Sequence, residues 1–122
     1  MHEASVVEAL VSMLALEVVK QGGGRVTVVR LVVGEATGYM PESLDFYFGQ
    51  LSKGSSLEGA RLEYRTVKAL LRCQACGREF ERARFTFECP DCGGQGQMTA
   101  IGRDFHVESI DLEAAQPDPG AS

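Results

Sequence analysis

The residues Cys73-Gln-Ala-Cys76 and Cys89-Pro-Asp-Cys92 form two Cys-x-x-Cys pairs, separated by positions 77 to 88, and they are the only cysteines in the chain. Each pair places two thiolates close enough to share a cation, and a hairpin of this length can bring both pairs around one Zn²⁺ ion in tetrahedral geometry. Because four thiolates leave no open coordination position, the pattern predicts a structural zinc site rather than a catalytic one.

Glycines follow both cysteine pairs, with Gly77 after the first and Gly93-Gly94 after the second. A metal-binding turn needs a residue that tolerates positive φ just past its second sulfur, and glycine adopts that conformation without strain. The alternatives are a redox dithiol and a pair of structural disulfides. A redox Cys-x-x-Cys motif is usually single and opens a helix after a strand, and neither pair has that context. Zinc is therefore the favoured interpretation.

The composition is that of a globular protein of about one domain, with 122 residues, 44% hydrophobic and 24% charged. The net charge of −5 argues against a nucleic-acid partner, because phosphate neutralisation requires clustered Lys and Arg. The sequence has no signal-peptide pattern and no apolar run near the ~20 residues that span a bilayer. We therefore expect a cytoplasmic protein without a membrane partner, since a reducing compartment suits thiolates that bind metal.

Two stretches have the apolar periodicity of helices. Ser5-Val6-Val7-Glu8 has the form of a capping box, which predicts a helix that begins at Val6 and ends near Lys20, before three consecutive glycines. Pro41 suits the first turn of a second helix, which Gly54-Ser55-Ser56 closes. The apolar stripes are Val7, Leu10, Val11, Leu14 and Val18 in the first helix, and Leu44, Phe48 and Leu51 in the second.

Three stretches are typical of strands. Residues 25–33 are mostly β-branched, residues 60–68 alternate between apolar and polar, and a third strand runs from Arg103 to Leu112. The apolar residues of the third strand change parity near Glu108-Ser109, which indicates a β-bulge. Residues 114–122 are rich in Pro, Gly and small residues, so we expect a disordered tail.

This order of elements predicts an α+β fold, with a three-stranded sheet, two helices packed on one face, and an inserted zinc-ribbon domain with four cysteine ligands. Residues 1–68 and 102–113 would form a nickel-binding α/β domain, for the reasons given below. Residues 69–101 would form the zinc-ribbon domain.

The first three residues, Met1-His2-Glu3, form a short arm before the first helix. The imidazole of His2 lies one residue from a free α-amine, so the amine, nearby amide nitrogens and the ring can reach one ion through small chelate rings. Amide nitrogens bind only ions that displace their protons, such as Ni²⁺ and Cu²⁺. Taken alone, a histidine near a terminus is more often a solvated residue.

Several motifs together resemble the HypA family, nickel metallochaperones of [NiFe]-hydrogenase maturation that also act on urease in some bacteria. The resemblance covers roughly residues 1 to 113. The motifs are Met1-His2-Glu3, Val32-Val33-Gly34-Glu35 with Pro41-Glu42-Ser43-Leu44, Cys73-x-x-Cys76-Gly77, Cys89-Pro90-x-Cys92-Gly93 and Ser109-Ile110-Asp111.

The resemblance implies that His2 coordinates transported Ni²⁺ through its ring, with the amine of Met1 and the backbone nitrogens of His2 and Glu3 as companions. The Glu3 carboxylate would tune metal affinity, meet a partner, or interact with the helix dipole. It further implies a HypB-type GTPase and a hydrogenase large-subunit precursor as partners. A homodimer is a further expectation. The chain is not expected to be an enzyme, and it has no phosphate-binding glycine motif of its own.

Two other functions are weaker alternatives. A zinc-ribbon adaptor would bind nucleic acid or protein without nickel transfer. Binding of nucleic acid would use Arg72, Arg78, Arg82 and Arg84, but residues 68–97 carry five basic and four acidic residues, a mixed surface. A zinc hydrolase would need an open coordination position and a general base. Residues 77–102 contain no histidine, unlike some family members, and His106 is interpreted as an ordinary strand residue.

Overall fold

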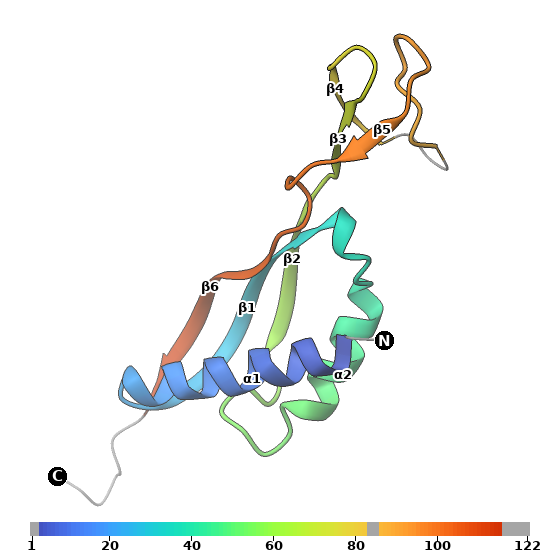
Figure 1. Cartoon of the computed structure of the whole chain (residues 1–122). Coiled ribbons are helices and arrows are strands. Elements are labelled where there is room, and N and C mark those ends of the chain that lie inside the picture. The colour runs from blue at the N-terminus through green and yellow to red at the C-terminus, as the bar shows by residue number, and fades with distance from the viewer. Residues whose placement is uncertain (1–2, 83–85, 116–122) are drawn as a thin grey trace, which may run out of the picture. The chain divides into compact units, whose positions relative to one another are not determined.

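The computed structural model describes residues 3–82 and 86–115. Its strands form two three-stranded sheets, of order β2-β1-β6 and β4-β3-β5 (Figure 1). Within the described ranges, no helix has the length and apolar character needed to cross a membrane. The elements are α1 (Glu3–Lys20), β1 (Gly24–Gly34), the 3₁₀ helix η1 (Glu35–Thr37), α2 (Pro41–Leu51), β2 (Arg61–Val67), β3 (Leu70–Cys73), β4 (Glu79–Glu81), β5 (Gly96–Met98) and β6 (Phe105–Ala114).

The chain divides into two compact units. The first contains both α-helices and is built from residues 1–31, 39–63 and 107–122, and the second, of residues 32–38 and 64–106, contains the sheet β4-β3-β5. The predicted α+β class is confirmed, because the described residues contain two α-helices, the three-stranded sheet β2-β1-β6 and a four-cysteine segment inserted between β2 and β6.

Helix α1 buries one apolar face and ends where the sequence predicts. All five residues of the predicted stripe are buried, and the helix ends at Lys20. Gly22 has φ of 96°, and the amide of Gly23 donates to the carbonyl of Val18 at 2.9 Å. This bond satisfies a carbonyl of the last turn that has no partner within the helix, as in other glycine-terminated helices.

The predicted start of α1 is wrong. The helix begins at Glu3, three residues before Val6, so Ser5 lies inside the helix and the capping box does not form there. The Glu3 carboxylate lies in the first turn, where negative charge is favourable, and its Oε2 accepts a hydrogen bond from the Met40 amide at 2.8 Å. A contact 37 positions away along the chain therefore accompanies the earlier start.

Helix α2 begins as predicted, with Pro41 in its first turn and Met40 as an extended N-cap. Leu44 and Phe48 are buried, but Leu51 is 37% exposed, so the predicted stripe is wrong at its last position. Leu51 is the final residue of the helix, where the chain turns toward Ser52.

Strand β1 is the central strand of its sheet, and adjacent residues such as Val28 and Val29 are both buried. Thr27 contacts Asp111 of β6, and Gly34 contacts Asp104, the residue before β6, so β1 and β6 run antiparallel. Burial along β6 changes phase at Glu108 and Ser109, as the sequence pattern predicts. Strand β6 continues to Ala114, so the predicted tail boundary is one residue early. The rest of that segment, 116–122, lies outside the described residues.

Arg30 links the three strands of this sheet. Its guanidinium forms two hydrogen bonds with Asp111 of β6, at 2.8 and 3.0 Å, and its Nε lies 3.2 Å from a carboxylate oxygen of Glu63 in β2. The bidentate pairing holds the pKa of Asp111 below its ordinary value, chiefly through the hydrogen bonds from Arg30.

Candidate metal sites

The sheet β4-β3-β5 brings the two cysteine pairs together. Strand β3 pairs antiparallel with β4, where Leu71 faces Phe80, and with β5, where Cys73 faces Gly96. The first cysteine pair begins at the last residue of β3. The second pair lies between Glu88 and Gln95, which form an antiparallel bridge just before β5. Because Cys73 at the end of β3 pairs with Gly96 at the start of β5, both cysteine pairs lie at the same end of the sheet. Residues 70–98, which hold this sheet and both cysteine pairs, form the ribbon.

Each cysteine pair forms a tight turn closed by a glycine. The carbonyl of Cys73 accepts a hydrogen bond from the Gly77 amide at 3.0 Å, and that of Cys89 accepts one from Gly93 at 2.9 Å. Gly77 and Gly93 have φ of 78° and 72°, which confirms the expectation of positive φ after each pair. In the first turn, the amides of Ala75 and Cys76 also donate to Cys73 Sγ, at 3.3 and 3.4 Å.

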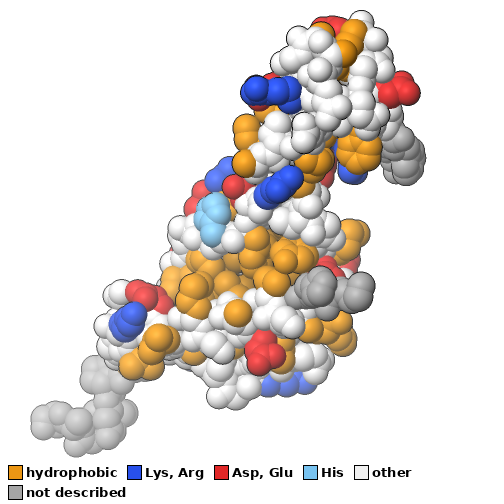
Figure 2. Space-filling view, viewed as in Figure 1, with side chains coloured by type: hydrophobic (Ala, Val, Ile, Leu, Met, Phe, Trp, Pro, Cys, Tyr) orange, Lys and Arg blue, Asp and Glu red, His pale blue; other side chains and the backbone are white. Residues whose placement is uncertain are grey.

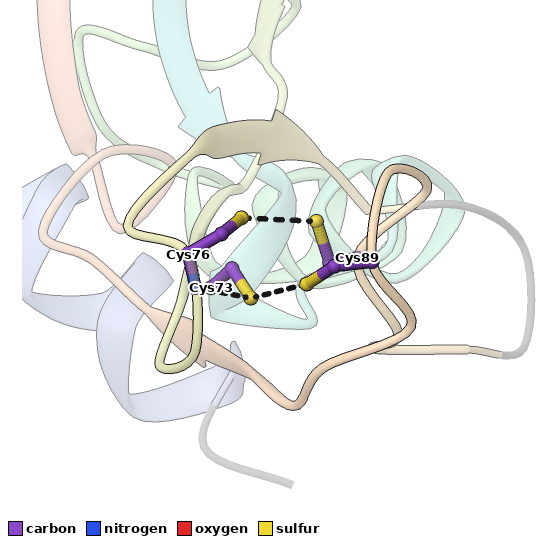
Figure 3. Close-up of side chains that lie close together, drawn as sticks. Cys73, Cys76 and Cys89 are labelled. Carbon is purple, nitrogen blue, oxygen red and sulfur yellow. Dashed lines mark hydrogen bonds between the residues drawn. The ribbon is translucent and has the colours of Figure 1, made fainter.

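The four sulfur atoms form one compact cluster, all within 4.8 Å of one another. Cys73 Sγ lies 3.5 Å from Cys92 Sγ, and Cys76 Sγ lies 3.7 Å from Cys89 Sγ. Figure 3 shows the side chains of Cys73, Cys76 and Cys89 converging from the two turns. Four sulfurs at the Zn–S distance of ~2.3 Å in a tetrahedron are ~3.8 Å apart. The cluster therefore has the dimensions of a tetrahedral thiolate site, and all four cysteines are free thiols.

The electrostatics of the cluster favour a bound cation. Hydrogen bonds from the backbone amides of Cys76 and Ala75 lower the pKa of Cys73 to about 6. At Cys92 the backbone of Gly94 lowers the pKa, but hydrogen bonding with the thiols of Cys73 and Cys76, together with burial, outweighs it and raises the pKa to about 12. Repulsion between neighbouring thiolates therefore disfavours deprotonation of all four cysteines, and a bound divalent cation offsets that repulsion.

Gly94 is a site residue whose separate role the sequence reasoning missed. A Cβ atom at this position would lie 2.8 Å from Cys73 Sγ, 2.9 Å from the Ala75 Cβ and 3.3 Å from Cys92 Sγ. Its carbonyl also accepts a hydrogen bond from the Cys89 amide at 2.8 Å. Gly93 supplies the positive φ, whereas Gly94 leaves room for the sulfurs. The only sequence signal for this second role is the doubled glycine.

The predicted nickel residues are described only in part. Met1 and His2 lie outside the described residues, so the proposed nickel ligands there stay predictions. Glu3 is the first residue of α1, and its carboxylate binds the Met40 amide. His106 lies exposed in β6.

Comparison with protein families gives a match over nearly the whole chain. The family model described as "Hydrogenase/urease nickel incorporation, metallochaperone, hypA" matches residues 1–112. The chain belongs to the HypA family. The matched region includes the N-terminal arm, both helices and all four cysteines, so the resemblance expected from the motifs is confirmed.

Curated relatives of this HypA-family chain are similar over their full length. The hydrogenase maturation factor HypA of Caldanaerobacter subterraneus subsp. tengcongensis is 46% identical over 114 residues, which cover 93% of this chain and 100% of that protein. HypA of Geobacter sp. strain M21 is 38% identical over 113 residues, with coverage of 93% and 100%.

Solved HypA structures share the fold. The solution structure of the Ni metallochaperone HypA from Helicobacter pylori has a TM-score of 0.62 at 21% identity and covers 94% of this chain and 100% of that one. A second solution structure of a HypA protein gives 0.65 at 22% identity, with coverage of 94% and 98%. At these identities the two structures support the fold alone.

Proposed function

We propose that this chain binds Ni²⁺ at its Met1-His2-Glu3 arm and delivers it for [NiFe]-hydrogenase maturation. The observation that carries the proposal is that the family match begins at residue 1, so the arm belongs to the length of chain that the family model describes. The ligands would be the His2 ring, the Met1 amine and the backbone nitrogens of His2 and Glu3. Nickel is cargo here, and no catalytic role is proposed.

The start of α1 at Glu3 supports amide ligation. The first amides of a helix have no acceptor within the helix, and Glu3 is the first helical residue. An amide proton displaced there by nickel would break no hydrogen bond of the regular i to i−4 pattern of the helix. Because the ring, the amine and the amides must all lose protons to bind, acid should weaken nickel binding.

We propose that the four thiolates of Cys73, Cys76, Cys89 and Cys92 hold a structural Zn²⁺ ion. The tetrahedral dimensions of the cluster and its four-sulfur donor set fit zinc. When bound, zinc supplies folding free energy to the ribbon. Its four thiolate ligands leave no open coordination position, so nickel would bind to the nitrogen ligands of the arm instead.

The outward face of α1 supports a role in docking a partner. Met13, Leu16 and Val19 are spaced along that face and are more than half exposed, and Figure 2 shows hydrophobic side chains at the surface on the side where α1 lies. We propose that a HypB-type GTPase binds there and that a hydrogenase large-subunit precursor receives the nickel, in the reducing cytoplasm. A second copy of the chain is a further candidate partner.

Calorimetric titration of Ni²⁺ into the untagged protein tests the arm. We compare it with His2→Ala, with a form extended by one residue before Met1, and with His106→Ala as the matched control. His2→Ala and the extended form should lose most of the nickel affinity and keep bound zinc, because they remove the ring and the free amine respectively. His106→Ala should bind nickel as the parent does.

Three outcomes would contradict the proposed nickel ligands of the arm. Full nickel affinity in His2→Ala would exclude the imidazole as a ligand, and full affinity in the extended form would exclude the amine. If X-ray absorption showed nickel bound by sulfur, the nickel site would be the cysteine cluster and not the arm.

A further inference from the structure

The four thiols of the ribbon divide into two pairs, each of which takes one sulfur from each cysteine turn. Cys73 Sγ lies 3.5 Å from Cys92 Sγ, and Cys76 Sγ lies 3.7 Å from Cys89 Sγ (Figure 3). Each pair contains one buried and one exposed cysteine, because Cys73 and Cys89 are buried whereas Cys76 and Cys92 are exposed. A solvent-borne oxidant therefore reaches one member of each pair, and the buried member lies in contact with it.

The two turns are also joined by contacts that involve no sulfur. The amide of Gln74, in the first turn, donates to the carbonyl of Gln95 at 2.9 Å. Arg78, which follows the first turn, forms an ion pair with Asp91 in the second turn. These contacts hold the sulfurs of one turn opposite those of the other.

Gly94 leaves space beside one of the two pairs. A Cβ atom at this position would lie 2.8 Å from Cys73 Sγ and 3.3 Å from Cys92 Sγ. Because glycine has no such atom, these two sulfurs can move from van der Waals contact toward the S–S bond length of about 2.05 Å without displacing a side chain of residue 94.

We propose that a peroxide converts the two cross-turn pairs into disulfides, Cys73–Cys92 and Cys76–Cys89, with release of the bound Zn²⁺ ion. This inference rests on the proposed structural zinc site. The disulfides connect the same two turns that the metal connects, so the oxidised ribbon keeps its fold without zinc. A disulfide within one turn, such as Cys73 with Cys76, would leave the two turns unconnected.

The oxidation is balanced for each pair by one molecule of hydrogen peroxide. The exposed thiolate attacks a peroxide oxygen, so that an S–O bond forms, the O–O bond breaks and hydroxide leaves. The buried thiolate then attacks the oxidised sulfur, so that the S–S bond forms, the S–O bond breaks and a second hydroxide leaves. Protons from solvent convert both hydroxides to water. Two peroxide molecules therefore consume all four thiolates, and the cation has no thiolate ligand left.

The pairing determines whether the zinc-free ribbon stays folded. A small domain with little apolar burial needs a metal or a cross-link. The cross-turn disulfides join residues 19 and 13 positions apart, and a cross-link restricts the unfolded chain more as the loop it closes becomes longer. A disulfide within one turn closes a loop of only a few residues and restricts little. The oxidised ribbon should therefore survive the loss of zinc, and thiol reductants with added Zn²⁺ should restore the original site.

Disulfide mapping of the whole protein tests the pairing. Zinc-loaded protein is treated with hydrogen peroxide, and a colorimetric chelator measures the zinc that is released. The chain has no other cysteines, and tryptic cleavage after Arg78 separates the two turns. Mass spectrometry without reductant should find the fragments of the two turns linked to each other. Fragmentation of the linked species should assign Cys73 to Cys92 and Cys76 to Cys89, with one Zn²⁺ ion released for every two disulfides.

Amide exchange tests whether the oxidised ribbon stays folded. Leu71 and Phe80 should remain protected in the oxidised, zinc-free parent and should lose protection when reductant is added without zinc. Two double variants, each of which replaces one buried and one exposed cysteine, form a matched comparison. The variant Cys76→Ser with Cys89→Ser keeps one cross-turn pair, and its oxidised form should protect these amides. The variant Cys89→Ser with Cys92→Ser keeps only the first turn, and its oxidised form should not.

Two results with the parent protein would overturn the inference: disulfides confined to single turns, or loss of protection at Leu71 and Phe80 on oxidation. These results are independent of whether the serine variants fold. Zinc analysis of the untreated protein separates this failure from failure of the proposed zinc site. If the untreated protein holds zinc on sulfur and oxidation links cysteines within single turns, only the cross-turn pairing is wrong. If it holds no zinc on sulfur and the cross-turn disulfides form, the zinc site is wrong and the pairing is supported.

Discussion

The ribbon and the first compact unit, which contains both α-helices and is called the helix–sheet unit, have cores of different kinds. The ribbon buries one small cluster, Leu71, Cys73, Phe80 and Cys89, with Met98 packed against it, so two of its four buried members are cysteines of the metal cluster. The helix–sheet unit buries apolar side chains from both helices and from β1. A small domain without enough apolar burial needs a metal or a cross-link. The ribbon should therefore depend on its ion, and the helix–sheet unit should not.

Removal of the metal should give the largest effect. Thiolate zinc sites of this kind bind with on the order of 10 to 16 kcal/mol, far more than the ribbon cluster can supply by itself. A strong chelator, or Cys76→Ser, should unfold the ribbon and leave the helices intact. Amide exchange should show loss of protection at Leu71 and Phe80 and retained protection in α1, while circular dichroism keeps its helical signal. Protected ribbon amides after zinc removal would refute this difference between the regions.

The reverse experiment removes apolar volume from the helix–sheet unit. Leu14 is 4% exposed, so Leu14→Ala should cost about 2 to 5 kcal/mol of unfolding free energy. Leu16, two residues along the same helix, is 57% exposed, and Leu16→Ala should change stability by less than about 0.5 kcal/mol. Urea unfolding followed by circular dichroism measures both, and a zinc assay should show full occupancy in each folded variant. Equal losses in the two variants would mean that the outward face of α1 is covered.

Gly94 tests how closely the ribbon packs around its sulfurs. Gly94→Ala places a Cβ 2.8 Å from Cys73 Sγ and should cost about 1 to 3 kcal/mol, with weaker zinc retention. Gly49→Ala in α2 meets no atom within 4 Å, so it should stabilise the helix by about 0.5 to 1 kcal/mol. Competition with a colorimetric chelator measures zinc retention, and urea unfolding measures stability. A Gly94→Ala protein that retains zinc like the parent would show that the sulfurs can shift at no cost.

The Arg30–Asp111 pair should give the smallest effect, because both side chains are substantially exposed. Arg30 lowers the folded-state pKa of Asp111, so the stabilisation is complete above the unfolded value of about 3.9 and is lost as pH falls through the lower folded value. The urea midpoint of Asp111→Asn should be slightly below that of the parent near neutral pH and equal to it in strong acid. Glu113→Gln, on the same strand, is the control. A difference that persists in strong acid would exclude the charge pair as its cause.

Local sequence patterns predicted the helices and turns well where a residue type has a single strong conformational preference. The stripe of α1, the Pro41 start of α2, and the glycines after each cysteine pair all follow from spacing and backbone freedom, and all are confirmed. The start of α1 was predicted wrongly because a Ser-x-x-Glu pattern is only a local signal. The contact from Glu3 to Met40 spans 37 positions, and no local pattern contains it.

The cysteine spacing by itself determined the four-sulfur site, because two Cys-x-x-Cys pairs joined by a hairpin of this length can place four thiolates around one ion. The periodicity of apolar residues likewise determined the α+β class. Only the tertiary structure decided which atoms surround the sulfurs and where the Glu3 carboxylate binds. Those contacts join residues that are distant along the chain, and their distances depend on how the elements pack rather than on the order of residues.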